Sequence, residues 1–368
     1  MYLGFVLSIF NFPLIEIGNN AIGIFDVWLV IFILISLVKK NITLNFYDPI
    51  FRTFLILFFL SFFSLFVNLE KLEINLLPTL LYSFKFLSFA FLTRMIYGTI
   101  SKEVSPNFFN ISLFLFISLL IYNFFIIIQG SFRGQMPFLY NSSGPLGLVI
   151  LSFALYFSNK YISVFRAILI RSSIIFLWLI SFSKTFLPGI FLMISYKLKT
   201  WQFLFLLAIT TILFFLNLSF LASEIFPRLE LIFSILSFDL ASEALSSFYA
   251  RINNHWFIYW EDLSLKTSLL GMGLWVTEIS FDSGYWFLFY SFGFVGFTII
   301  TTSLLIEVFK KQPTEIVIFW ISIVVSLLLL ETFFVSYRGI EPMIFLYNFI
   351  LLEKLNDRVP QTQNSKSN

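Results

Sequence analysis

The residues best suited to chemistry gather in one stretch, 221–282, which is the longest polar interval of the chain. This stretch interleaves carboxylates and cations with Trp and Tyr, and it holds the only histidine of the sequence. When a mostly apolar chain keeps its ionisable groups in one interval, that interval is a candidate functional site. Its charged residues and its histidine are Glu224, Arg228, Glu230, Asp239, Glu243, Arg251, His255, Glu261, Asp262, Lys266 and Asp282.

The rest of the chain has the composition of a membrane protein. Of its 368 residues 59% are hydrophobic and only 12% are charged, whereas about 25% are charged in a typical soluble domain. The net charge of +3 is small and the basic residues form no long runs, which excludes nucleic acid as a partner. Because there are no cysteines, disulfides and thiolate metal sites are excluded too. We expect a single transmembrane domain over residues 1–368.

The apolar runs predict an all-α polytopic fold. A transmembrane helix needs about 20 apolar residues, and roughly 10 to 12 spans fit into the chain, with about 12 preferred. Between them lies a long loop, 221–283, and the polar tail 355–368 is expected to be disordered. The expected spans are 2–17, which is either a first span or a partial one, and 21–38, 50–67, 76–97, 108–128, 144–157, 165–180, 185–196, 201–221, 284–309, 314–337 and 341–352.

The distribution of Lys and Arg sets the orientation. Cytoplasmic loops carry an excess of these residues, and in this topology the excess lies on the side of both termini, so the long loop faces outward. The cytoplasmic group is Lys39, Lys40, Lys102, Lys160, Arg166, Lys197, Lys199, Lys310, Lys311, Lys354, Arg358 and Lys366. The outward group is Lys71, Arg133, Lys184, Arg228, Arg251, Lys266 and Arg338.

Four outward cations, Arg133, Lys184, Arg251 and Arg338, stand close to expected membrane boundaries. Each alone could reach up to a lipid headgroup. Together on one face they favour an anionic substrate. Three further cations, Lys85, Arg94 and Arg171, fall in apolar runs and must face other helices, water or the cytoplasmic boundary, and Glu331 is the natural ion-pair candidate for Arg338.

Three segments carry a family resemblance. Arg133 and Gly144, separated by ten residues, lie in RGQMPFLYNSSGPLG; Lys184 lies in LISFSKTFLPG; Arg251 opens RINNHWFIYWEDLSLKTSLLGMGL, which is followed by DSGYWFLFYSFGFVG with Asp282. In order, spacing and outward placement these segments resemble those of bacterial O-antigen polymerases (Wzy family), over about two thirds of the chain. The family usually has arginine where this chain has Lys184, a point charge instead of a bidentate fork.

The resemblance implies a lipid-donor (GT-C-like) glycosyltransferase bundle in the bacterial inner membrane, with no cofactor. The implied substrates are polyprenyl-pyrophosphate-linked oligosaccharides, as donor and acceptor, and a chain-length regulator and a flippase are partners that such an enzyme can have. Cations would stabilise the pyrophosphate leaving group and a carboxylate would accept the proton of the attacking hydroxyl. The implied catalytic residues are Asp282 and Arg251, with Glu261, Asp262 or His255 as other bases; the implied substrate-binding residues are Arg133, Gly144, Lys184, Arg251 and His255.

Each of these residues also has a structural interpretation. Ser143, Gly144 and Pro145 could bind phosphate at a helix N-terminus or merely cap the helix, and Asp282 could cap the next span. His255 could be a hydrogen-bonded loop residue. The loop aromatics could stack on sugars or form an interfacial belt. No second histidine or cysteine supports a zinc site, and the adjacent Glu261 and Asp262 make a poor cage for a divalent cation.

Two other functions remain open. A flippase or transporter of the same lipid-linked glycan would also need outward cations, but the sequence shows no internal repeat of the kind many transporters have. An O-antigen ligase would use the same chemistry with a different acceptor. The related ligases have a histidine where this chain has Asp282, which favours the polymerase.

Overall fold

A computed structural model describes residues 1–17, 20–39, 48–99, 105–129, 134–138, 143–158, 160, 163–181, 186–195, 259–274, 283–327 and 337–358. Over these ranges the chain is mostly α-helical. The helices are α1 (Tyr2–Ile9), α2 (Ile24–Val38), α3 (Pro49–Val67), α4 (Leu72–Thr99), α5 (Ser105–Ile128), α6 (Ser143–Ser158), α7 (Val164–Ser181), α8 (Leu187–Ser195), α12 (Leu265–Leu270), α13 (Gly284–Phe309), α14 (Thr314–Ser326) and α15 (Tyr337–Arg358).

Helices long and apolar enough to cross a membrane confirm the coarse prediction of a helical membrane protein. Among the described residues, four stretches meet both conditions: Pro49–Val67, Leu76–Ile96, Asn107–Ile128 and Gly284–Phe309. Three shorter apolar helices accompany them, at Ile24–Val38, Gly144–Ser158 and Thr314–Ser326. The expected span at 201–221 and most of the long loop lie outside the described residues.

The N-terminal segment differs from the expected span at 2–17. Helix α1 has 8 residues, so it is about 12 Å long and cannot cross an apolar layer of roughly 30 Å. It is followed by an antiparallel hairpin of β1 (Pro13–Ile17) and β2 (Asn20–Gly23). Pro13 cannot donate a helical hydrogen bond, and the Asn11 side chain accepts from the backbone N–H of Phe25 at 3.0 Å. A full first span is therefore wrong, and the hairpin is a short β element within a mostly helical fold.

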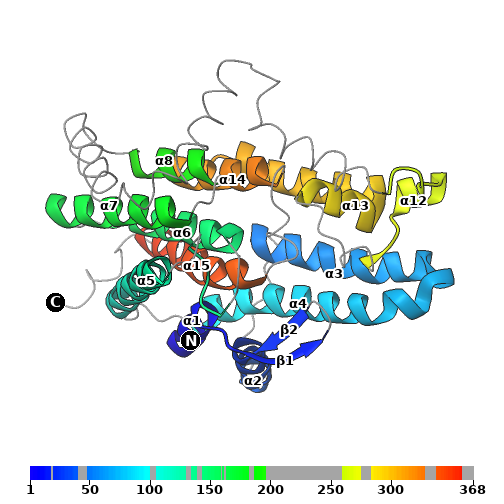
Figure 1. Cartoon of the computed structure of the whole chain (residues 1–368), viewed down its shortest axis with the longest axis horizontal. Coiled ribbons are helices and arrows are strands. Elements are labelled where there is room, and N and C mark those ends of the chain that lie inside the picture. The colour runs from blue at the N-terminus through cyan, green and yellow to red at the C-terminus, as the bar shows by residue number, and fades with distance from the viewer. Residues whose placement is uncertain are drawn as a thin grey trace, which may run out of the picture.

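Two groups of helices make up the core (Figure 1). In one, α3 and α4 lie side by side, joined by the short 3₁₀ turn η1 (Leu69–Lys71), and α13 packs along α3. In the other, α6 packs on α15, with α7, α8 and α14 against α6. Helix α5 is joined to the second group by aromatic packing: the Phe108 ring of α5 stacks on the Phe349 ring of α15, with 3.3 Å between centroids.

Local chemistry explains where α3 begins, and α15 ends later than expected. Asp48 caps α3 by accepting from the N–H groups of Ile50 at 2.9 Å and Phe51 at 3.1 Å, and Pro49 occupies the first turn. Helix α15 continues to Arg358, so the first four residues of the tail expected to be disordered, 355–358, are helical. The remaining tail lies outside the described residues.

Helix α13 is broken at Gly293, which has φ of +66°. A left-handed residue interrupts the helical hydrogen bonds and leaves carbonyls before the break without their usual donors. The segment that follows α12 supplies donors instead: Met272 N–H bonds the Tyr290 carbonyl at 2.7 Å and Gly273 N–H bonds that of Ser291 at 3.3 Å. The end of the long loop is thereby fixed to α13.

Candidate site at the motif segments

Most of the predicted site residues fall outside the part of the chain that the structure describes. Arg133, Lys184, Arg251, His255 and Asp282 all lie in undescribed intervals, as does Glu331, the predicted partner of Arg338. Gly144 is described. It lies in the first turn of α6 and is partly buried, as expected for a helix start after Ser143. The residues next to the motifs nevertheless show how several of the motif segments are held.

The segment directly after Arg133 is fixed between α5 and α7. Gly134 N–H donates to the Ile180 carbonyl of α7 at 2.8 Å, and Gln135 N–H donates to Asn123 Oδ1 of α5 at 2.7 Å. Asn123 is fully buried and its own amide donates to the Leu119 carbonyl. Because α7 ends at Ser181, three positions before Lys184, the segments containing Arg133 and Lys184 meet.

The approach of these two segments requires a glycine. A Cβ on Gly134 would lie 2.7 Å from Asn123 Oδ1 and 3.0 Å from the Ser181 Cα atom. Both distances are shorter than ordinary contacts, so any side chain here would push the 134–138 segment away from α7. The glycine that follows Arg133 thus sets how closely the two motif segments can approach.

Helix α14 links the end of the Lys184 motif, at Gly189, to the start of α13, at Ser283 and Gly284. Gly189 of α8 packs so closely on Ser322 of α14 that a Cβ there would overlap the serine side chain. Five residues further on, at the C-terminal end of α14, the Leu327 carbonyl accepts from Gly284 N–H at 2.7 Å and from Ser283 Oγ at 3.2 Å. Ser283 therefore bonds to α14 and does not cap α13 with its side chain.

The described end of the long loop meets α13 through aromatic rings. Tyr259 packs edge-on against Tyr290 with centroids 5.7 Å apart, and Trp286 stacks on Tyr290 at 5.6 Å. Tyr259 is 9% exposed, whereas Trp260 is 55% exposed. Tyr259 and Tyr290 are buried packing residues, and Trp260 is the most exposed of these four rings.

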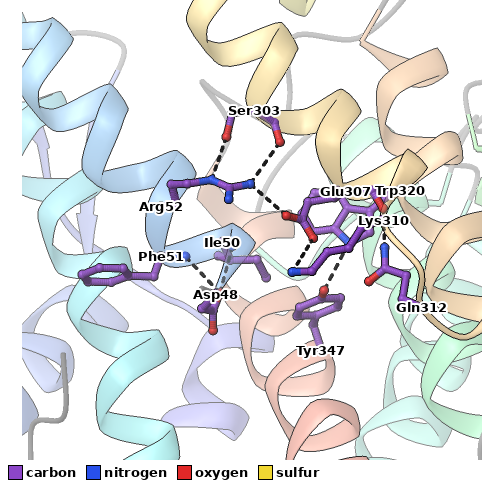
Figure 2. A network of polar contacts seen from close by, with 10 residues as sticks. All are labelled: Asp48, Ile50, Phe51, Arg52, Ser303, Glu307, Lys310, Gln312, Trp320 and Tyr347. Carbon is purple, nitrogen blue, oxygen red and sulfur yellow. Dashed lines mark hydrogen bonds and ion pairs between the residues drawn. The ribbon is translucent and has the colours of Figure 1, made fainter. Parts of the chain in front are cut away.

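A charged cluster around the buried Glu307 is the functional candidate that the sequence did not reveal (Figure 2). Arg52 of α3 donates to Glu307 Oε1 of α13 at 2.8 Å and to the Ser303 hydroxyl and carbonyl at 3.1 and 3.2 Å. Glu307 is 1% exposed, and Lys310 Nζ lies 3.7 Å from its second oxygen. Arg52 and Glu307 stand 255 positions apart, so only the packing of α3 on α13 could have paired them.

Asp48 and Arg94 extend this cluster toward α4. Arg94 is 2% exposed and its guanidinium lies 4.6 Å from the centre of the Phe51 ring. Burial raises the pKa of the Asp48 carboxyl, while the hydrogen bond from Phe51 N–H and the charge of Arg94 act in the opposite direction. Arg94 thus faces other helices, one of the options expected from its place in an apolar run.

A separate ion pair joins the ends of α6 and α15. Lys160 bonds Glu353, and its ammonium group also lies 4.7 Å from the centre of the Tyr156 ring. Within the described ranges, no group of three or more His, Cys, Asp or Glu side chains could hold a metal ion.

Comparisons with known proteins give no match of any kind: no family model, no curated protein and no solved structure aligns significantly with the chain.

Proposed function

We propose that the protein polymerises polyprenyl-pyrophosphate-linked oligosaccharide repeat units into a surface polysaccharide on the outer side of the bacterial inner membrane. The product is an O-antigen or a capsule, and transfer inverts the anomeric centre. In this function, the outward cations of a helical membrane protein bind the anionic pyrophosphate of a lipid-linked donor. It rests on the resemblance of three segments to the Wzy family.

One observation carries the proposal: the hydrogen bond from Gly134 N–H to the Ile180 carbonyl. It joins the neighbour of Arg133 to the last turn of the helix that leads to Lys184. A pyrophosphate needs several donors that converge, because its charge grows as the glycosidic bond breaks. Segments of two separate motifs that meet through buried backbone contacts support a shared anion site.

In the proposed reaction the hydroxyl of the acceptor sugar attacks the anomeric carbon of the donor. The new glycosidic C–O bond forms as the bond from that carbon to pyrophosphate oxygen breaks, and polyprenyl pyrophosphate departs. Arg133, Arg251 and Lys184 hold the departing phosphates, and Asp282 accepts the hydroxyl proton. Gly144, in the first turn of α6, contributes one backbone N–H that favours phosphate.

A flippase of the same lipid-linked unit is the second candidate, and the buried cluster of Arg52 and Glu307 favours it. Intramembrane charge of this kind marks ion and substrate pathways in many transporters, whereas the polymerase reaction has no role for it. The two functions differ in where the lipid-linked repeat unit accumulates when the protein is absent.

The test is a deletion of the gene in the source strain, followed by restoration, with surface glycans separated on a gel. A polymerase predicts loss of the polymer ladder, survival of a band with a single repeat unit, and accumulation of the lipid-linked unit on the outer side. Loss of every repeat-bearing band with accumulation on the inner side would replace the polymerase by the flippase. An unchanged polymer ladder would contradict both the polymerase and the flippase function.

A further inference from the structure

We propose that residues 259–274 form a lipid-contacting edge of the protein. In this proposal Leu265, Leu269 and Trp260 enter the leaflet next to the turn between α3 and α4, although they belong to the long polar interval of the sequence. The partner is the bilayer itself, through its acyl chains and interfacial layer. The proposal does not depend on the reaction that the protein catalyses.

The segment is fixed at membrane depth by its contacts with the broken helix α13. Met272 and Gly273 donate to the Tyr290 and Ser291 carbonyls, and Asn68 Nδ2 donates to the Gly271 carbonyl at 3.2 Å. Irregular backbone is tolerated inside an apolar layer only where protein groups satisfy its hydrogen bonds. These contacts satisfy the N–H groups of Met272 and Gly273 and the carbonyl of Gly271.

Helix α3 gives the depth of this contact. Its 19 residues make it about 28 Å long, close to the thickness of a bilayer's hydrocarbon core. The Ser64 hydroxyl, one turn before the end of α3, donates to the Ser291 carbonyl at 3.1 Å. The contact therefore lies roughly 5 Å inside the end of the span.

Three of the exposed side chains of the segment are large and apolar. Leu265 is 81% exposed, Trp260 55% and Leu269 44%. Leu265 and Leu269 are four positions apart on α12 and so share one face. An apolar face that projects from the protein is unfavourable in water but is stabilised in the acyl chains, and tryptophan is enriched at the boundary of the two.

This apolar face continues the exposed surface of the candidate spans. The Leu269 backbone lies against Gly293, where a Cβ would overlap the leucine carbonyl. The next residue of α13, Phe294, is 55% exposed, and Phe66 near the end of α3 is 68% exposed. Figure 1 shows α12 beside α13 at the end of the bundle where α3 turns into α4. The lipid-facing sides of α3 and α13 thus extend onto α12.

The polar residues of the segment mark its water side. Glu261 and Asp262 are exposed, and Lys266 pairs with the exposed Glu70 at 3.3 Å. A lysine can bury its aliphatic stem along apolar surface and keep its ammonium at the headgroups. The segment therefore has an acyl-chain side with the two leucines and a headgroup side with the charges.

The absence of cysteine from the sequence makes this proposal direct to test. The full chain carrying Leu265→Cys, Leu269→Cys or, as the matched control, Glu261→Cys is labelled with bimane in nanodiscs of phosphatidylethanolamine and phosphatidylglycerol. Trp260→Cys serves as a position outside α12. Nitroxide-labelled acyl chains should quench the two leucine positions roughly twofold more than position 261. Iodide in the water should quench position 261 most, with position 260 between the extremes.

Two results would overturn the proposal. Iodide quenching at positions 265 and 269 equal to that at 261, with no effect of the nitroxide lipids, would place the leucines in water. Protection of both positions from both quenchers would mean that protein covers them. If one of the two leucine variants aggregates, quenching at the remaining leucine position and at position 260 distinguishes lipid contact, water contact and cover by protein.

Discussion

The segments beside the motifs and the cluster of Arg52 and Glu307 are held in different ways. At the motifs, backbone N–H groups and close glycine contacts join elements, as between Gly134 and Ile180. In the cluster, charged side chains join α3 to α13. The first arrangement is made by backbone groups, whereas the second engages the side chains of Arg52 and Glu307 in an ion pair within the protein. We therefore propose the motif segments, and not the cluster, as the source of the substrate-binding cations.

The largest expected effect is the loss of one charge from the cluster. Arg52→Ala should lower the free energy of unfolding by about 3–5 kcal/mol, because Glu307 is 1% exposed and would keep a buried charge with only the half-exposed Lys310, 3.7 Å away, beside it. Thermal unfolding in detergent measures this. Arg166→Ala, which removes an exposed arginine of α7, is the matched control and should change little.

The double variant Arg52→Ala with Glu307→Ala sharpens this prediction. It should lose less stability than the sum of the two single variants, since no charge remains buried without its partner. Equal and small losses in all three variants would show that water reaches the pair and that charge does not hold α3 to α13.

A smaller effect is expected where glycine holds the motif segments together. Gly134→Ala should cost about 1–3 kcal/mol, because the added methyl meets Asn123 Oδ1 at 2.7 Å and little space is free. It should also shorten the polysaccharide, since the neighbouring Arg133 moves relative to α7. Full stability and a normal glycan ladder would contradict the tight approach of the 134–138 segment to α7.

The smallest effect belongs to the cap of α3. Asp48→Ala should lose about 1 kcal/mol with its two hydrogen bonds to backbone N–H groups. Asp48→Asn should keep most of that stability, because asparagine caps as well as aspartate does. An equal loss in both variants would mean that the charge facing Arg94, and not the cap, is what stabilises this position.

Apolar patterning predicted the helices well and their partners poorly. The span at 284–309 has the bounds of α13, because apolar length and a polar boundary are local properties. The break at Gly293 was not foreseen, since it depends on donors from residues 272 and 273. The pairing of Arg52 with Glu307 was missed for the same reason, because the sequence of one apolar run does not determine which other helix packs against it.

The N-terminus and the site show two further limits. Segment 2–17 is apolar enough for a span, but Asn11 and Pro13 turn it into a short helix and a hairpin. For the site, the sequence supplied residue types and order, and the structure adds that the Arg133 and Lys184 segments meet. The roles of Arg133, Lys184, Arg251, His255 and Asp282 stay predictions, since those residues lie outside the described ranges.

The most direct test of the proposed function replaces the outward cations one at a time. Arg133→Ala and Arg251→Ala are introduced into the deleted strain, with Lys71→Ala, an exposed cation outside the motifs, as the control. Membrane levels of each variant are matched by immunoblot before the surface glycans are compared. The account predicts that both arginine variants lose the polymer ladder and keep the single-repeat band, while the lysine variant makes wild-type polymer. Wild-type ladders from both arginine variants would contradict it.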